Sequence, residues 1–159
     1  MKFNVALKNF FIVLFATLLL SACSTAKKAG PQTVDDVYTG TETIEYLAKG
    51  VPDRVFFATN KSKLTTAARD TLRKQATWLR KNKSINITVE GHADERGTRE
   101  YNLALGERRA NSAKDYLMTY GISGKRISVI SYGKERPVNP TSSPLAWSQN
   151  RRSVTVKAN

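Results

Sequence analysis

The sequence predicts an α+β fold, a two-layer sandwich in which a mixed four-stranded sheet carries its helices on one face. Three observations lead to this prediction. Strand-like and helix-like segments alternate in the order βαβα between residues 55 and 120. Two more strand-like segments complete the order βαβαββ. The segment 53–159 that contains them, about 105 residues, suits one compact domain with its own core.

The first two predicted elements lie between residues 55 and 82. Val55–Phe57 is a short apolar run and is predicted to be a strand. A helix is predicted to follow, with Thr65 or Thr66 as its N-cap and its end near Asn82. Its apolar residues recur at helical intervals, as Leu64, Ala68, Leu72, Ala76 and Leu79.

The second strand is predicted at Ile85–Glu90, where apolar and polar residues alternate. Alternation of this kind directs every second side chain toward a core. The apolar face comprises Ile85, Ile87 and Val89, and the other face comprises Asn86, Thr88 and Glu90. Gly91 is predicted to end this pattern, and a charged loop follows.

The second helix is predicted to run from about Asn102 to Tyr120, with Gly121 as a natural stop. One stripe of this helix is small in its middle, which suits close packing on a sheet. The stripe consists of Leu103, Gly106, Ala110, Ala113 and Leu117.

The last two strands are predicted at Ile127–Ser131 and Ser153–Val156. The connection between them contains proline and serine over residues 137–144, with one helical turn predicted around Leu145–Gln149. The chain shows no internal repeat.

The N-terminal residues predict an export signal. Lys2 and Lys8 precede a short apolar stretch, Phe10–Leu20, and the small residues that follow lead into Cys23. Cys23 is the only cysteine, so no disulfide can form within the chain. The run Leu-Ser-Ala-Cys looks like a bacterial lipobox, which predicts that residues 1–22 are removed and that Cys23 is lipidated.

Residues 23–52 are predicted to form a tether, because they lack a long periodic pattern and are rich in Thr, Gly and Lys. A chain of about thirty residues reaches about 100 Å when extended. Thr43–Leu47 is expected to form a short helix or strand docked on the domain, so the tether is predicted to be only partly loose.

The candidate site lies in the run Thr88–Thr98, which reads TVEGHADERGT, and in the helix after it. A strand that delivers a charged loop onto the start of a helix is a common way to build a polar binding site. Asn102, Leu105 and Arg109 share one helical stripe, which presents Arg109 toward the loop that carries Asp94. A carboxylate binds an ammonium and a guanidinium binds a carboxylate, so this pair suits a zwitterion.

These residues resemble the OmpA-like peptidoglycan-binding domain family over about two thirds of the chain, roughly Arg54–Val156. Further similar segments are Ser131–Pro137 and Asn150–Arg152. The resemblance implies that the domain binds the stem peptide of peptidoglycan non-covalently. It further implies recognition of the end of diaminopimelate that carries both an amine and a carboxylate.

The resemblance also implies which residues bind. The family's Asp falls on Asp94 and its Arg on Arg109, and the full predicted peptidoglycan-binding set is Asp94, Arg109, Asn102, Leu105, Phe57, Ala58 and Thr98. Close relatives often have Phe-Asp where this chain has Phe57-Ala58. Only backbone groups are therefore expected to contribute at position 58.

Membership of this family would imply an outer-membrane lipoprotein with a multiply acylated Cys23 and a periplasmic domain. Ser24 follows the cysteine, and in the usual bacterial sorting pattern a residue other than Asp there implies the outer membrane, with the inner membrane as the alternative. The resemblance also implies work with the Tol system, including the propeller protein TolB, and a role in envelope integrity during division. It implies no cofactor and no catalytic turnover.

Parts of the sequence are compatible with two other functions. Glu90, Asp94 and Glu95 are the carboxylates a wall-cleaving enzyme would use, but the chain has no Gly-x-Ser-x-Gly elbow and its one cysteine lies outside the domain. Glu90 and Glu95 are instead expected to be solvated or to pair with Arg96 and Arg99. The formal net charge of +13 raises nucleic acid as a partner, which the export signal argues against.

Several single residues have a structural interpretation. His92 is the only histidine, so a zinc cluster is not expected, and it is predicted to orient the loop structurally or by hydrogen bonding. Arg108 and Arg109 point about 100° apart on a helix, so only Arg109 is assigned to the ligand. Arg151 and Arg152 face opposite sides of a strand, so at most one is expected at the site.

Overall fold

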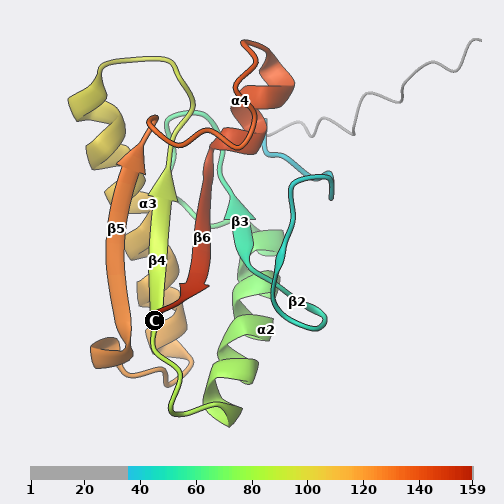
Figure 1. Cartoon of the computed structure of the whole chain (residues 1–159), viewed down its shortest axis with the longest axis vertical. Coiled ribbons are helices and arrows are strands. Elements are labelled where there is room, and N and C mark those ends of the chain that lie inside the picture. Colours follow the sequence, from blue (N-terminus) through green and yellow to red (C-terminus); the bar gives the residue numbers. More distant parts are fainter. Residues whose placement is uncertain (1–35, 159) are drawn as a thin grey trace, which may run out of the picture.

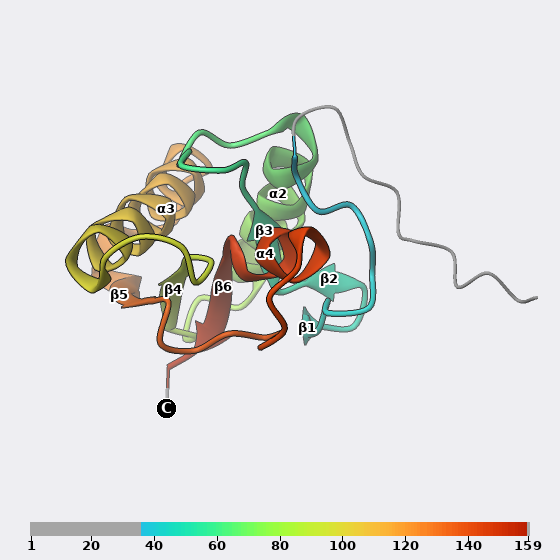
Figure 2. The same ribbon diagram turned by 90° about the horizontal axis from the view of Figure 1, so that it is seen from above.

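The computed structural model describes residues 36–158. In it, four strands lie side by side in one sheet, and two long helices cover one face of the sheet (Figure 1). The view from above shows α2 and α3 on the same side of the sheet (Figure 2). The strands are β3 (Arg54–Phe56), β4 (Ile87–His92), β5 (Ile127–Gly133) and β6 (Arg152–Lys157), and the helices are α2 (Thr66–Lys81) and α3 (Arg99–Thr119). The smaller elements are β1 (Tyr46–Ala48), β2 (Val51–Pro52), the 3-10 turn η2 (Gly124–Arg126) and α4 (Pro144–Asn150).

The strand order in the sheet is β3-β6-β4-β5. β6 is antiparallel to both β3 and β4, whereas β4 and β5 are parallel. A parallel neighbour requires a crossover connection, and α3 supplies it between β4 and β5. The mixed four-stranded sheet with helices on one face confirms the predicted fold class.

Threonine side chains cap both long helices. The Thr65 hydroxyl accepts a hydrogen bond from the Ala68 amide, and the Thr98 hydroxyl accepts one from the Tyr101 amide. The cap at Thr98 makes α3 begin at Arg99, three residues earlier than the apolar periodicity predicts. The first turn of α3 is polar, so periodicity alone does not locate it.

The core lies between the sheet and the two helices. Val55, Phe57, Ile87 and Val89 from the strands are buried against apolar residues of α2 and α3. The helical partners include the predicted stripes, with Leu72, Ala76 and Leu79 on α2 and Ala110, Ala113 and Leu117 on α3. At about 25 cal/mol per Å² of buried apolar surface, this layer is the main source of stability.

The prediction that Gly91 ends the second strand is wrong, because β4 continues through Gly91 to His92. The reason is a close approach between β4 and α3. A Cβ atom on Gly91 would lie 1.8 Å from the carbonyl oxygen of Gly106 in α3. Gly91 therefore serves helix packing within the strand and does not break it.

The last part of the predicted tether packs against the domain. We call residues 36–52 the N-terminal strap. Tyr38 packs edge-on against Phe56 with ring centroids 4.8 Å apart, and both side chains are buried. The strap also contains β1, paired antiparallel with β2, so Leu47 becomes buried. The predicted signal peptide over residues 1–22, Cys23 and the first part of the tether lie outside the described residues.

Within residues 36–158, no helix combines the length and the apolar composition that crossing a membrane requires.

Candidate functional site

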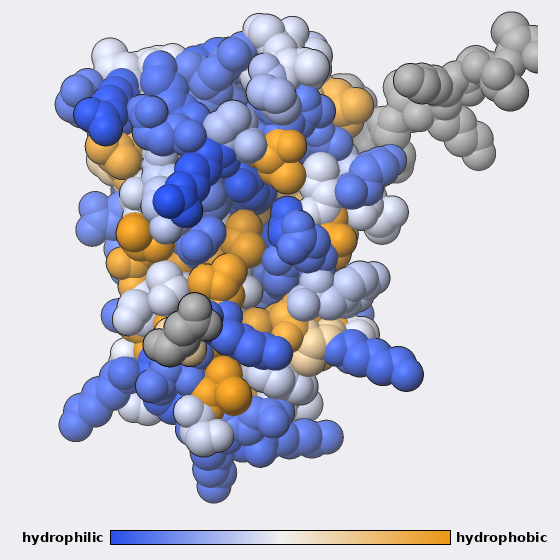
Figure 3. All heavy atoms as spheres, in the orientation of Figure 1, coloured by the Kyte–Doolittle hydropathy of each residue, from blue (hydrophilic) through white to orange (hydrophobic). Residues whose placement is uncertain are grey.

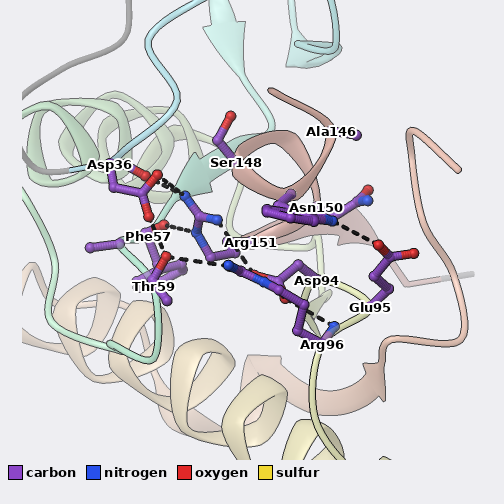
Figure 4. Close-up of polar contacts among 12 residues, drawn as sticks. Asp36, Phe57, Thr59, Asp94, Glu95, Arg96, Ala146, Ser148, Asn150 and Arg151 are labelled. Atoms are coloured by element: carbon purple, nitrogen blue, oxygen red, sulfur yellow. Dashed lines mark hydrogen bonds and ion pairs between the residues drawn. The ribbon is translucent and has the colours of Figure 1, made fainter. Parts of the chain in front are cut away.

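The predicted site residues gather at one end of the sheet. The loop after β4, the start of α3, the end of β3 and the residues that follow α4 meet there, as the close-up shows (Figure 4). These segments meet because β3 and β4 end, and β6 begins, at the same edge of the sheet. Charged side chains from distant parts of the sequence are therefore brought together.

Asp94 is the acidic centre of the site and is almost fully buried. Its Oδ1 accepts from the Arg96 amide at 3.1 Å and from Arg96 Nε at 3.0 Å, and its Oδ2 accepts from Arg96 Nη2 at 2.7 Å. Arg151 Nη1 lies 3.4 Å from the same Oδ2. Burial by itself would raise the pKa of Asp94, but the hydrogen bonds and charge of Arg96 outweigh it, so the pKa is lowered.

Arg109 is completely buried on α3. Its guanidinium donates to three backbone carbonyls, those of Lys61 at 2.9 Å, His92 at 2.8 Å and Ala58 at 3.2 Å. Burial lowers the pKa of Arg109 to about 10, with a further contribution from the positive charge of Arg151. Arg109 thus holds three separate segments of the chain at the site.

The predicted pair of Asp94 and Arg109 lies in one cluster, but the two side chains do not form a direct ion pair among the described contacts. Arg151 lies beside both of them: it contacts Asp94, and its charge acts on Arg109. Asp94 is also near enough for its charge to favour the protonated form of Arg109. The arrangement is therefore a network of charges around Asp94 and not an isolated acid–base pair.

Arg151 is the principal site residue that the sequence did not assign. Its side chain is 1% exposed, and its Nε donates to the Phe57 carbonyl at 3.1 Å. Its Nη2 forms an ion pair with Asp36 Oδ1 at 3.0 Å and also donates to the Asp36 carbonyl. Arg152, on the opposite side of β6, donates to the Arg136 carbonyl instead. Of these two arginines, Arg151 therefore lies in the cluster around Asp94 and Arg152 does not.

The stripe of α3 that contains Asn102, Leu105 and Arg109 supports the loop after β4. Asn102 and Leu105 are both buried, and Asn102 Nδ2 donates to the Arg96 carbonyl at 2.8 Å. Thr98 caps α3 and so sets where the helix begins beneath the loop. At the end of β3, Phe57 and Ala58 offer carbonyl oxygens to Arg151 and Arg109. Ala58 contributes its backbone carbonyl, as expected for a position without a carboxylate.

Arg96 is held on two sides. Its guanidinium pairs with Asp94 and stacks over the Trp147 ring, 4.2 Å from the ring centroid. Glu95 accepts from Trp147 Nε1 at 2.8 Å and from the Ser142 hydroxyl. Of the two alternatives expected for Glu95, solvation or pairing with Arg96 and Arg99, the first holds, because its side chain is exposed and bonds to Trp147 and Ser142. Of the three arginines in the cluster, Arg96, Arg109 and Arg151, Arg96 is the most exposed, with a side chain 42% accessible.

His92 is buried next to the site, with its ring 5.5 Å from that of Tyr132. Neither ring nitrogen has a hydrogen-bond partner, and Nε2 lies 3.5 Å from the Glu90 carboxylate. Burial lowers the pKa of His92 to about 3, helped by the positive charges of Arg152 and Arg54. The ring is therefore neutral and packs structurally, while the His92 carbonyl accepts from Arg109. No cluster of potential metal ligands occurs in residues 36–158.

The charges of the site favour an anionic group. Three guanidiniums, from Arg96, Arg109 and Arg151, face two carboxylates, from Asp94 and Asp36. Arg109, Arg151 and Asp94 are buried, whereas Arg96 and Asp36 are about half exposed, so the buried charges comprise two cations and one anion. A ligand that brings a carboxylate together with an ammonium would match both signs.

Comparison with known proteins identifies the family of the chain. The model of the OmpA family matches residues 56–151, which contain every predicted site residue except Cys23. Peptidoglycan-associated lipoproteins from Brucella melitensis and Rhizobium meliloti are 43% and 45% identical to the chain over 158 residues. These alignments cover 96% of this chain, and 94% and 89% of the two relatives.

Solved structures share the fold. The crystal structure of the peptidoglycan-associated lipoprotein from Burkholderia pseudomallei is 33% identical, with a TM-score of 0.65 over 67% of this chain and 90% of that one. The C-terminal domain of MotB from Helicobacter pylori is 22% identical, with a TM-score of 0.63 over 67% of this chain and 84% of that one. The second likeness concerns the fold alone.

Proposed function

The chain belongs to the OmpA family, and from this premise we propose that it binds peptidoglycan without cleaving it, through the diaminopimelate of the stem peptide. The observation that carries the proposal is the buried Asp94 carboxylate surrounded by guanidinium groups. The far end of diaminopimelate has an ammonium and a carboxylate on one carbon. The ammonium is assigned to Asp94, and the carboxylate to the guanidiniums of Arg109 and Arg151.

Binding requires an exchange at Asp94. The lone pairs of this carboxylate are occupied by Arg96 and Arg151. Arg151 is enclosed, whereas Arg96 is partly exposed and lies on a loop. We assign to Arg96 the position that the ligand ammonium takes, so the ligand enters as the Arg96 side chain swings out. Asn102 and Arg109 stay fixed and preserve the shape of the site.

The same proposal places the domain in the cell envelope. Lipidation at Cys23 would anchor the chain, and each acyl methylene buried in the membrane contributes about 0.8 kcal/mol, so more than one acyl chain is needed for stable attachment. The outer membrane, a non-enzymatic role, and partnership with TolB and other Tol proteins in envelope integrity and division belong to this proposal. Peptidoglycan-associated lipoprotein is the name borne by relatives that align with nearly the whole chain.

The test is a pull-down of the full chain with purified cell-wall sacculi. Asp94→Asn keeps the size of the side chain but removes its charge, and we expect a loss of at least tenfold in affinity. A charge-assisted hydrogen bond contributes about 1.5–3 kcal/mol, which supports this magnitude. Arg109→Ala is expected to abolish binding as well. Lys74→Ala, on the exposed face of α2, is the matched control and should bind normally.

Circular dichroism of each variant checks that it is folded, because Arg109 bonds to three segments of the chain. Undiminished binding by a folded Asp94→Asn protein would remove Asp94 from the site. Release of soluble wall fragments by the wild type would favour the hydrolase. Binding that falls steeply with salt and ignores replacement of diaminopimelate by lysine in the stem would favour a general binder of anionic surfaces.

A further inference from the structure

A closed ring of side chains joins the N-terminal strap to the loop after β4 (Figure 4). Asp36 Oδ1 pairs with Arg151 Nη2 at 3.0 Å, and Arg151 Nη1 lies 3.4 Å from Asp94 Oδ2. Arg96 Nη2 donates to the same Asp94 oxygen at 2.7 Å and to the Thr59 hydroxyl at 3.5 Å. The Thr59 hydroxyl donates in turn to Asp36 Oδ2 and closes the ring. The strap therefore belongs to the charge network of the site.

The charged members of this ring alternate between buried and exposed groups. The side chains of Arg151 and Asp94 are 1% and 9% accessible, whereas those of Arg96 and Asp36 are 42% and 51% accessible. An exposed carboxylate thus lies on a buried guanidinium, and an exposed guanidinium lies on a buried carboxylate. Together the two exposed groups present the charges of a zwitterion to the buried pair.

Asp36 fills the donor capacity of one nitrogen of Arg151. Nη2 of a guanidinium carries two N–H groups. In this chain the nitrogen forms an ion pair with Asp36 Oδ1 and also donates to the Asp36 carbonyl. A ligand carboxylate therefore gains access to Nη2 when the Asp36 carboxylate leaves it. The bond to the Asp36 carbonyl does not depend on the side chain and keeps the strap on the domain.

The end of the molecule that holds this ring is polar. Figure 3 shows hydrophilic residues gathered at the upper end of the face in view, the end at which β4 and β5 terminate in Figure 1. Apolar residues reach the surface farther down the same face (Figure 3). The Asp36 carboxylate is already half exposed, so it moves from Arg151 into water without crossing an apolar region.

We propose, building on the proposed function, that in the free chain the Asp36 carboxylate occupies the position that the diaminopimelate carboxylate takes at Arg151. Asp36 and Arg96 then substitute for the two charges of the ligand, Asp36 for its carboxylate and Arg96 for its ammonium. Binding exchanges each exposed group for a ligand group of the same sign, so the buried pair keeps its counter-charges throughout. Asp36 is therefore an internal competitor that lowers the affinity for ligands with a free carboxylate.

Amidation of the ligand carboxylate removes this competition. A neutral amide brings no charge to Arg151, so displacement of Asp36 would leave the buried guanidinium with Asp94 alone, which the ligand ammonium also uses. Asp36 therefore stays on Arg151 when an amidated ligand binds. The effect of Asp36 is confined to the free acid.

Titration calorimetry of the full chain with two soluble stem peptides tests the competition. One peptide has a free carboxylate at the far end of diaminopimelate, and in the other this group is an amide. Asp36→Asn keeps the shape of the side chain without its charge. It should bind the free acid about three- to tenfold more tightly than wild type, because a charged competitor is removed, and change the affinity for the amide by less than twofold.

Asp115→Asn is the matched control, because it makes the same chemical change on the exposed face of α3. It should bind both peptides as wild type does. Hydrogen exchange of the strap amides should be equal in Asp36→Asn and wild type, since the carbonyl bond and the packing of Tyr38 on Phe56 remain. Faster exchange of the strap in Asp36→Asn would mean that the whole strap and not the carboxylate limits binding, which overturns the inference.

The same titrations separate failure of this inference from failure of the proposed function. Unchanged binding of the free acid by Asp36→Asn, weaker binding of both peptides, or an equal gain for the amide overturns the competition, provided that wild type binds and Asp94→Asn does not. Weaker binding of both peptides would make Asp36 a positioning residue for Arg151. Absence of binding by wild type would overturn the proposed function and this inference together.

Discussion

The charge of Asp94 is neutralised within its own loop. Arg96 neutralises Asp94 with three hydrogen bonds from one residue, two from the side chain and one from the backbone. The side-chain bonds are made by a partly exposed group, so their net contribution is screened by water. Arg96 therefore competes with a ligand ammonium without being essential to the fold.

Arg96→Ala is expected to bind a soluble diaminopimelate stem peptide about three- to tenfold more tightly than the wild type, because a competing cation is removed. Titration calorimetry with the full chain measures this. Arg96→Lys retains the charge and is the control, with affinity near that of the wild type. Weaker binding by Arg96→Ala would mean that Arg96 contacts the ligand and does not stand in for it.

His92 predicts a pH dependence of stability. In the folded chain the pKa of His92 is lowered from 6.5 to about 3 by burial. Between these values the unfolded chain binds one proton more than the folded chain, so stability falls as pH drops through this window, by up to about 1.4 kcal/mol per pH unit. The neighbouring Glu90 has a raised pKa and acts in the opposite direction near the acidic end.

The measurement is the unfolding free energy in urea at pH 7, 6, 5 and 4. His92→Phe keeps a ring against Tyr132 and is expected to flatten the pH dependence above pH 5. Because the chain has a single histidine, no other imidazole contributes to the difference between the two proteins. Parallel curves for the two proteins would show that His92 does not titrate differently on folding.

At the residue scale, the sequence predicted the side chains that share a short segment or a helical stripe. Asp94, Asn102, Leu105 and Arg109 follow from such local spacing, and all four are buried at one end of the sheet. Arg151 could not be assigned in this way. Its contact with Asp94 spans 57 positions, and it depends on the placement of β6 next to β4.

At the scale of elements, the contact between β4 and α3 depends on two glycines. Gly91 and Gly106 face each other, and α3 approaches the strand so closely that no side chain fits between them. The helix stripe that is small in its middle predicted close packing on the sheet. Its partner in the strand was not predicted, because a glycine in a strand resembles a strand end when sequence alone is considered.

Gly91→Ala is expected to destabilise the chain by about 3 kcal/mol, because the new Cβ would meet backbone atoms of α3 that cannot move independently. Urea denaturation measures the change. Gly124→Ala is the control: its Cβ would meet the flexible end of Met118 at 3.3 Å, so the change should stay within about 0.5 kcal/mol. Similar stability of Gly91→Ala and wild type would show that the helix can shift away at little cost.

Capping residues explain which element boundaries were predictable. Thr65 was expected as a cap and is one, so α2 begins where predicted. Thr98 lies in a loop rich in charge, where no apolar period marks the helix, so the start of α3 was placed too late. The start of a helix was therefore predictable where a capping residue directly precedes the first apolar residue of the helical period.

At the scale of the whole molecule, the fold class followed from the order of strands and helices, together with chain length. The strap did not. Residues 36–52 have no long apolar period, yet Val37, Tyr38 and Leu47 are buried against the domain. Val37 and Tyr38 are buried against Phe56, on a surface that exists only once the sheet has formed. The position of a short segment that packs onto a surface formed by other elements cannot be predicted from the pattern of its own residues.

Asp36 decides how mechanical load would pass through the molecule. Its carboxylate pairs with Arg151, which in turn contacts Asp94. In a chain held by lipid at Cys23 and by the wall at Asp94, a pull between membrane and wall would enter at Asp36 and leave through Asp94, with one arginine side chain between them. Arg151 also donates to the carbonyl of Phe57, whose side chain is in the core, so part of this load would pass to the hydrophobic layer at the end of β3.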